Sequence, residues 1–137
     1  MPGASLSPYL MFDGNAREAM EFYHDVLGGE LKVQTFGEVP DMPPPPGYEN
    51  RVMHAHLDAD GVVIMASDPP PGSGVRFGDN VNLSLMGTDG DKLSRVFNDL
   101  SEGGKVTMPL ARQFWGDTFG SLTDRFGVNW MVNISDK

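Results

Sequence analysis

An internal repeat covers most of the 137 residues of this chain. The segment FYHDVLGGEL, which starts at Phe22, resembles VFNDLSEGGKV, which starts at Val96. Likewise, LDADGVVIM from Leu57 resembles LTDRFGVNWM from Leu122. Each half is therefore expected to build the same supersecondary unit. One such unit leaves a face of its small sheet exposed, whereas two units can close around a shared concave surface, where ligands commonly bind.

Each half has the hydrophobic pattern of one strand, one helix and three further strands. Apolar residues in the segment 16–27 recur at intervals of three and four, which predicts an amphipathic helix, and the segment around Leu93 and Leu100 repeats this spacing. Apolar runs between turn residues predict the strands. These are expected at Leu6–Phe12, Glu30–Glu38, Arg51–Asp58, Val62–Ser67, Asn80–Gly87, Lys105–Thr107, Phe114–Thr123 and Val128–Ile134.

Local signals mark the ends of the first helix. Asn15, followed three residues later by Glu18, matches a capping box, in which each side chain accepts a hydrogen bond from a free backbone N–H. Gly28 and Gly29 are expected to end the helix, because glycine adopts the left-handed conformation at little cost. Asp124 is expected to be a turn residue before Gly127.

The elements predict an α+β protein made of two βαβββ modules that form an incomplete barrel. Module one is expected at residues 5–68 and module two at residues 80–135. A linker rich in proline and glycine, residues 69–79, joins them, and the proline-rich segment 39–50 is expected to be an extended loop. The range 1–137 is treated as a single domain.

Composition excludes several classes of function. The net charge of −9 argues against binding to nucleic acid or to an anionic membrane, because both require a basic surface. The absence of cysteine excludes disulfides and thiolate chemistry. No segment approaches the roughly 18 apolar residues of a membrane span, and the N-terminus lacks the pattern of a signal peptide. We therefore expect a cytoplasmic protein without nucleic-acid or membrane partners.

Three motifs resemble those of the vicinal oxygen chelate superfamily, which includes glyoxalase I, extradiol dioxygenases and the fosfomycin and bleomycin resistance proteins. They are SPYLMFDGNAREAMEFYHDVLGGEL, VMHAHLDADGVVIMASD and FWGDTFGSLTDRFGVNWMVNI, and they resemble the PhnB-like subgroup most closely. The resemblance implies a glyoxalase-like domain, a small-molecule ligand and a homodimer. Some relatives are named after ubiquinone methylation, but this chain lacks a glycine-rich strand–helix junction for a nucleotide-type methyl donor.

The resemblance also implies positions for a metal site. In metal-using relatives the ligands come from the first strand of each module and from the last strand of the second, and here they fall on Pro8, Asn82 and Met131. Proline has no side-chain donor, an amide is a weak ligand, and a thioether is too soft for magnesium, manganese or zinc. The neighbours Tyr9, Ser84 and Asn133 do not restore the set, so no metal or other cofactor is expected.

His54 and His56 are two residues apart on a predicted strand and should share one face. They could be structural imidazoles, His54 could contact a ligand, or both could hold a metal with Asp68, Glu49 or a group from a partner chain as third ligand. The PhnB-like resemblance favours His54 as the functional residue of the two.

Aromatic residues of the second module complete the set of candidates. Trp115, Phe119 and Trp130 are expected in strands, and burial in the core is the commoner role for such residues. Alternatively, Trp115 and Phe119 line an apolar cavity. We place His54, Asn82, Trp115 and Phe119 at a cavity that binds or transforms a small molecule without the metal triad. The alternatives are a metal-dependent lyase or dioxygenase-like enzyme using His54 and His56, and a dimer that sequesters a drug or metabolite without chemistry.

Overall fold

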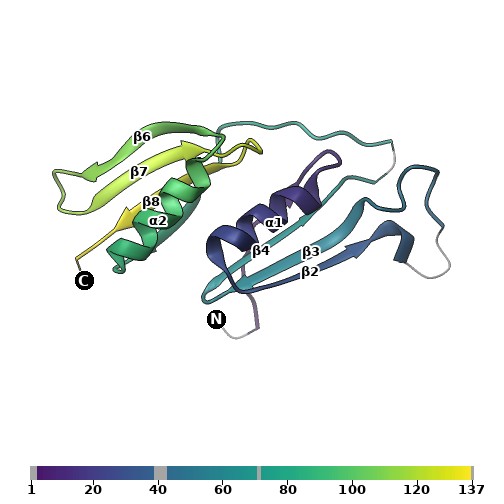
Figure 1. Ribbon diagram of the computed structural model, residues 1–137, viewed down its shortest axis with the longest axis horizontal. Coiled ribbons are helices and arrows are strands. Elements are labelled where there is room, and N and C mark those ends of the chain that lie inside the picture. Colours follow the sequence, from purple (N-terminus) through teal and green to yellow (C-terminus); the bar gives the residue numbers. More distant parts are fainter. Residues whose placement is uncertain (1–2, 39–42, 71, 137) are drawn as a thin grey trace. The chain divides into compact units, whose positions relative to one another are not determined.

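A computed structural model describes residues 3–38, 43–70 and 72–136 (Figure 1). Its first half contains, in chain order, β1 (Tyr9–Met11), α1 (Ala16–Leu27), β2 (Glu30–Thr35), the short 3-10 helix η1 (Phe36–Glu38), β3 (Val52–Ala59) and β4 (Val62–Ser67). Its second half contains β5 (Leu83–Gly87), α2 (Gly90–Ser101), β6 (Lys105–Arg112), β7 (Thr118–Thr123) and β8 (Asn129–Ile134). No helix in the described part of the chain is long and apolar enough to cross a membrane.

The strands form two four-stranded sheets with the same topology. The first sheet has the order β1-β4-β3-β2 and the second the order β5-β8-β7-β6. In each sheet the first strand is parallel to its neighbour and the other pairs are antiparallel. The predicted α+β fold of two βαβββ modules is therefore confirmed, and neither sheet closes on itself.

The chain divides into two compact units, Met1–Arg76 and Phe77–Lys137. The division falls within the range 69–79 that the sequence predicts to be a linker. Each unit contains one sheet and one helix, so each has its own core. That the two modules act as a single domain stays a prediction.

One helix covers one face of each sheet, as the hydrophobic spacing predicts. The helix α1 buries Ala16, Ala19, Met20 and Tyr23, and α2 buries Val96, Phe97 and Leu100. The sheet residues beneath the helices are buried too; in the first module they include Ala55, Leu57, Ile64 and Ala66, and in the second Leu122, Trp130 and Val132. The buried position of Trp130 confirms its predicted role in the core.

Glycines at the ends of the two helices confirm the repeat in three dimensions. A Cβ added to Gly29 would collide with the carbonyl oxygen of Asp58, and one added to Gly104 would collide with the carbonyl oxygen of Thr123. Gly29 also has a φ of +85°, which residues other than glycine rarely adopt. In both modules the chain leaving the helix thus passes directly against the backbone of the third strand.

Several strand boundaries differ from those predicted. The strand β1 contains only three residues, and β2 ends at Thr35, directly before the 3-10 helix η1 begins at Phe36. In the second module, β6 extends to Arg112, and β7 begins only at Thr118. The expected strand Phe114–Thr123 is therefore partly wrong, because residues 113–117 form the turn of the β6–β7 hairpin.

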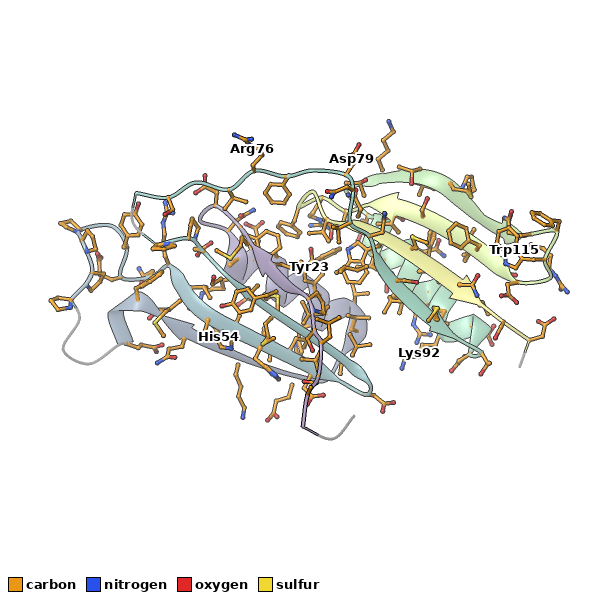
Figure 2. All side chains as sticks on the ribbon, turned by 180° about the vertical axis from the view of Figure 1, so that it is seen from behind. Tyr23, His54, Arg76, Asp79, Lys92 and Trp115 are labelled. Carbon is orange, nitrogen blue, oxygen red and sulfur yellow. The ribbon has the colours of Figure 1, made fainter. Side chains whose placement is uncertain are left out.

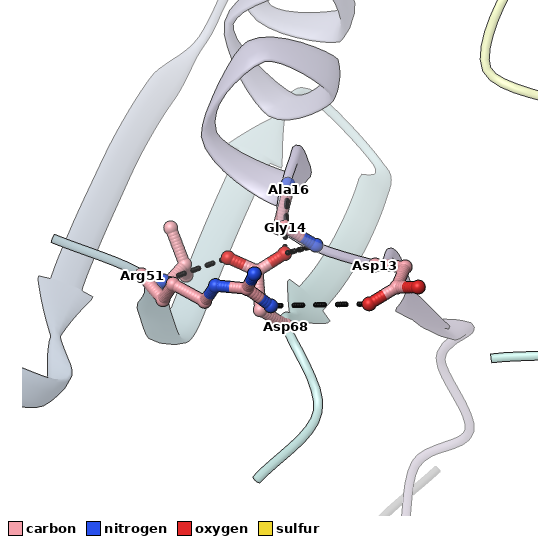
Figure 3. Close-up of polar contacts among 6 residues, drawn as sticks. Asp13, Gly14, Ala16, Arg51 and Asp68 are labelled. Carbon is pink, nitrogen blue, oxygen red and sulfur yellow. Dashed lines mark hydrogen bonds and ion pairs between the residues drawn. The ribbon is translucent and has the colours of Figure 1, made fainter. Parts of the chain in front are cut away.

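The buried side chain of Asp68 links three parts of the first module (Figure 3). Its Oδ1 accepts hydrogen bonds from the backbone N–H groups of Gly14, at 2.8 Å, and Ala16, at 3.0 Å. Its Oδ2 accepts one from the N–H of Val52, at 2.9 Å. The predicted capping box is wrong, since Asn15 makes no side-chain capping bond. A residue 52 positions away caps the start of α1 instead.

Asp124 has a comparable role in the second module. Its Oδ1 accepts from the backbone N–H groups of Phe126 and Val128, as in the turn predicted for it. Its Oδ2 accepts a hydrogen bond of 2.9 Å from the indole Nε1 of Trp130, which is 1 % exposed. The carboxylate therefore satisfies the polar group of the largest core residue.

The strand β6 lies at the edge of the second sheet and is irregular. Its register with β7 shifts between Val106 and Met108 and again between Met108 and Ala111. Pro109 lies within the second shift and has no N–H to donate. All residues of this strand except Leu110 are exposed.

We predict that Asp68→Asn strongly destabilises the first module. An amide keeps only one acceptor oxygen, so its NH₂ group faces a backbone N–H, and the loss should be about 2–3 kcal/mol in the free energy of unfolding. Urea denaturation measures it. Asp13→Asn is the matched control, because the Asp13 side chain is 64 % exposed and lies 3.8 Å from Arg51. It should change stability by less than about 0.5 kcal/mol; equal effects of both changes would contradict the role of Asp68.

Candidate functional site

The two histidines lie on the open face of the first sheet, opposite α1. Along β3, Ala55 and Leu57 are completely buried, whereas His54 and His56 are half-buried. Because strand side chains alternate between faces, the two imidazoles share the face that the helix does not cover. Their ring centroids are 6.5 Å apart. His54 and His56 therefore share one face of β3, as the two-residue spacing predicts. His54 is labelled in Figure 2.

Strand register identifies the neighbours of the histidines on this face. His56 lies between Met65 on β4 and Lys32 on β2, and Met65 is in turn paired with Tyr9 on β1. His54 is paired with Gln34 on β2. Directly paired strand residues point to the same side of a sheet, so all of these side chains share the open face. Met11, two residues after Tyr9 on β1, lies on the same face. We call the part formed by Tyr9, Met11, Met65, His54 and His56 the open-face site.

A hydrogen bond orients the imidazole of His54. The hydroxyl of Tyr9 lies 3.1 Å from Nδ1 of His54, and the two ring centroids are 5.7 Å apart. The tautomer decides which group donates. In either case the bond occupies Nδ1 and leaves Nε2 as the ring nitrogen for a ligand. The phenol and imidazole together form a polar pair next to the thioethers of Met11 and Met65.

The residues on the strands used by metal-binding relatives do not fit such a metal site. The open-face residue of β1 nearest to the expected ligand position Pro8 is Tyr9, which is paired with Met65. On β5 and β8 the paired residues Ser84 and Met131 occupy the corresponding positions. A phenol, an alcohol and a thioether do not make a set of ligands for a hard or borderline divalent ion.

Asp68 and Glu49, the two candidates of this chain for a third metal ligand beside His54 and His56, accept hydrogen bonds from backbone N–H groups. Asp68 is 2 % exposed and accepts three backbone hydrogen bonds, and Glu49 accepts one from the N–H of Gly47. Within residues 3–38, 43–70 and 72–136, no three His, Cys, Asp or Glu side chains are grouped as a metal site requires.

Two candidates of the second module lie together, and a third lies apart. Phe119 is half-buried on β7, and its ring centroid is 6.1 Å from that of Trp115. Trp115 lies in the β6–β7 turn and is 51 % exposed, so the expectation that it belongs to a core strand is wrong (Figure 2). Asn82 is exposed and precedes β5. It is displaced from the level of Phe119 by four residues, about 13 Å of strand.

Some residues of these surfaces were not among the sequence-based candidates. The sequence points to Tyr9 only as a neighbour of the metal-ligand position Pro8, and it gives no sign of a role for Lys32 or Gln34. The positions of Lys32 and Gln34 follow from the register between β2 and β3. This register cannot be predicted from the sequence, because a long Pro-rich loop separates the two strands. Phe114, which is 96 % exposed and stacks edge-on against Trp115 with centroids 5.0 Å apart, was assigned to a strand.

Comparison with known proteins identifies relatives over almost the whole chain. Protein YjdN from Escherichia coli is 36% identical, and the match covers 94% of each protein. The crystal structure of protein PA1353 from Pseudomonas aeruginosa matches with a TM-score of 0.86 and 41% identity, covering 97% of this chain and 98% of that one. The PhnB protein from Bacillus cereus matches with a TM-score of 0.76 and 26% identity, covering 96% and 100%.

The family model described as Glyoxalase/Bleomycin resistance protein/Dioxygenase superfamily matches residues 5–132. This range includes both βαβββ modules almost completely. The match agrees with the topology of the two sheets and with the similarity to PhnB. The chain therefore belongs to the glyoxalase, bleomycin resistance protein and dioxygenase superfamily.

Proposed function

We propose that this protein binds a small, largely apolar molecule at the open-face site without the metal ligands of its superfamily. The observation that carries the proposal is the composition of this face. Tyr9 is 46 % exposed and hydrogen-bonded to the imidazole of His54, and Met11, two residues further along β1 on the same face, is 37 % exposed. Exposed aromatic and thioether side chains next to a few placed polar groups are typical of ligand sites.

Each part of the open-face site has a distinct role in this proposal. The ring of Tyr9 offers a flat apolar surface, and the flexible thioethers of Met11 and Met65 can adapt to ligands of different shape. His54 supplies a polar contact through Nε2, in the orientation set by Tyr9. The role of His54 as a ligand-binding residue is the one expected from the sequence.

In the second module, considered by itself, we propose that Phe119 and Trp115 form an aromatic surface that can contact a ligand. Phe119 lies on the open face of its sheet, and Trp115 extends this aromatic surface into the hairpin turn. The amide of Asn82 stays a predicted ligand contact. Binding without turnover, as in a sequestering protein, is the form of this function that we propose, because the described groups supply apolar contact surface and a placed hydrogen-bonding nitrogen.

The role of Tyr9 predicts a specific loss of binding. In a fluorescence titration with the neutral apolar probe N-phenyl-1-naphthylamine, Tyr9→Ala should weaken binding about threefold to tenfold, because an aromatic contact surface is lost. Leu6→Ala is the matched control, since Leu6 is in the same module and 98 % exposed. Unchanged affinity in Tyr9→Ala, or an equal loss in the control, would refute the site.

The absence of a suitable ligand set predicts that binding does not depend on a metal. After growth in metal-supplemented medium, elemental mass spectrometry of the untagged protein should find far less than one divalent ion per chain. Treatment with a chelator should leave the affinity for N-phenyl-1-naphthylamine unchanged. Nearly one ion per chain that is lost in His54→Ala would instead support the metal-dependent enzyme that uses His54 and His56.

We also propose that the chain forms a homodimer, as its family resemblance implies. The edge strands of the second sheet carry exposed apolar residues: Met86 is 75 % exposed on β5, and Val106 and Met108 are 41 % and 44 % exposed on β6. Burial of such residues in a subunit interface would be favourable. Sedimentation equilibrium should give twice the chain mass of 14.9 kDa, and a monomer at micromolar concentration would contradict the proposal.

A further inference from the structure

Beside the apolar part of the open-face site, four hydrogen-bonding side chains form a compact group. Lys32 is paired with His56, and Gln34 is paired with His54, across the β2–β3 ladder. Directly opposite residues of antiparallel strands have Cβ atoms about 4.5–5.5 Å apart, so the two pairs make a block two residues wide and two rows deep. We call Lys32, Gln34, His54 and His56 the donor block.

We propose that the donor block binds an anionic oxygen group of the ligand, such as a carboxylate or a phosphate-type group. The apolar body of the same ligand would lie against Tyr9 and Met65. This inference rests on the proposed function and narrows the ligand class from an apolar molecule to an apolar acid.

The charges of the block support an anion as its occupant. The block contains no carboxylate, although the chain has 19 acidic and only 10 basic residues. Among the residues that the structure describes, Lys32 makes no ion pair. The ammonium group of Lys32 therefore has no carboxylate partner in the block, and an anion bound beside it would form an ion pair with it.

The hydrogen-bonding capacity of the block also matches an oxyanion. Lys32 has three N–H donors, and the amide of Gln34 adds two. When the Tyr9 hydroxyl donates to Nδ1 of His54, the Nε2–H of this ring can donate to the ligand. The side chain of His56 makes no hydrogen bond within the described residues. Donors from adjacent strands can therefore reach different oxygens of one anionic group, and such charge-assisted bonds are among the stronger ones.

Acidic residues limit the position of the anion on this face. The next row of the same face contains the pair of Asp58 and Glu30. Asp58 lies two residues after His56, and Glu30 lies two residues before Lys32. Both are exposed. Their charges repel an anion at the end of the hairpin, which leaves the rows of His56 and His54 as the favourable place.

The test compares two probes that differ in charge and share an apolar body: 1-naphthoate and 1-naphthamide. Titrations of the full chain are followed by NMR signals of the histidine rings and methionine methyl groups at low ionic strength. We expect 1-naphthoate to bind about tenfold more tightly than 1-naphthamide, because only the carboxylate can form charge-assisted hydrogen bonds with the donor block. The change Lys32→Gln should lower the affinity for 1-naphthoate about threefold to tenfold and leave the affinity for 1-naphthamide unchanged.

Lys92→Gln is the matched control, because it removes the same charge from an exposed lysine of α2 in the other module (Figure 2). Loss of 1-naphthoate affinity in Lys32→Gln but not in Lys92→Gln supports the inference. Equal affinities of the two probes, or equal effects of the two variants, would overturn it while the proposed function stands. Failure of both probes to perturb the site would overturn the inference and the proposed function together.

Discussion

The carboxylate of Asp68 is the contact on which the first module depends. It joins the end of β4 to the turn before α1 and to the start of β3 through three backbone hydrogen bonds. A buried carboxylate is stable only when such donors satisfy it, so the helix and two strands have to assemble around it together. The open face of the sheet is positioned by the same strands. Asp68 therefore helps to fix the orientation of β3, and with it the position of His54, although its carboxylate is not part of the open-face site.

Local patterns were sufficient to predict much of the fold. The spacing of Ala19, Met20 and Tyr23 indicates a helix whatever the rest of the chain does, and the repeat indicates its partner in the second module. The cap of α1 could not be predicted in this way, because Asp68 and Ala16 are 52 residues apart. Trp115 was placed wrongly for a different reason. A strand and a hairpin turn with two aromatic residues have similar compositions, and only pairing with a neighbouring strand distinguishes them.

In the candidate site, too, features within one strand could be predicted from the sequence, whereas contacts between strands could not. The shared face of His54 and His56 follows from the two-residue period of a strand. The contact of Tyr9 with His54 and the pairing of Lys32 with His56 follow from register between strands separated by loops, which the sequence does not determine. The superfamily scaffold is present in this chain. Membership of the superfamily therefore establishes the fold, and the chemistry has to be read from the residues on the open faces.

The irregular register of β6 affects how this protein behaves at high concentration. A regular edge strand of eight residues would present a continuous series of free N–H and C=O groups, which can recruit strands from other molecules into fibres. Two register shifts bend this series, and Pro109 removes one of its donors. The edge can thus carry exposed apolar side chains without serving as a template for aggregation. Replacing Pro109 would restore one backbone donor to this edge, on a strand that carries none of the proposed ligand-binding residues.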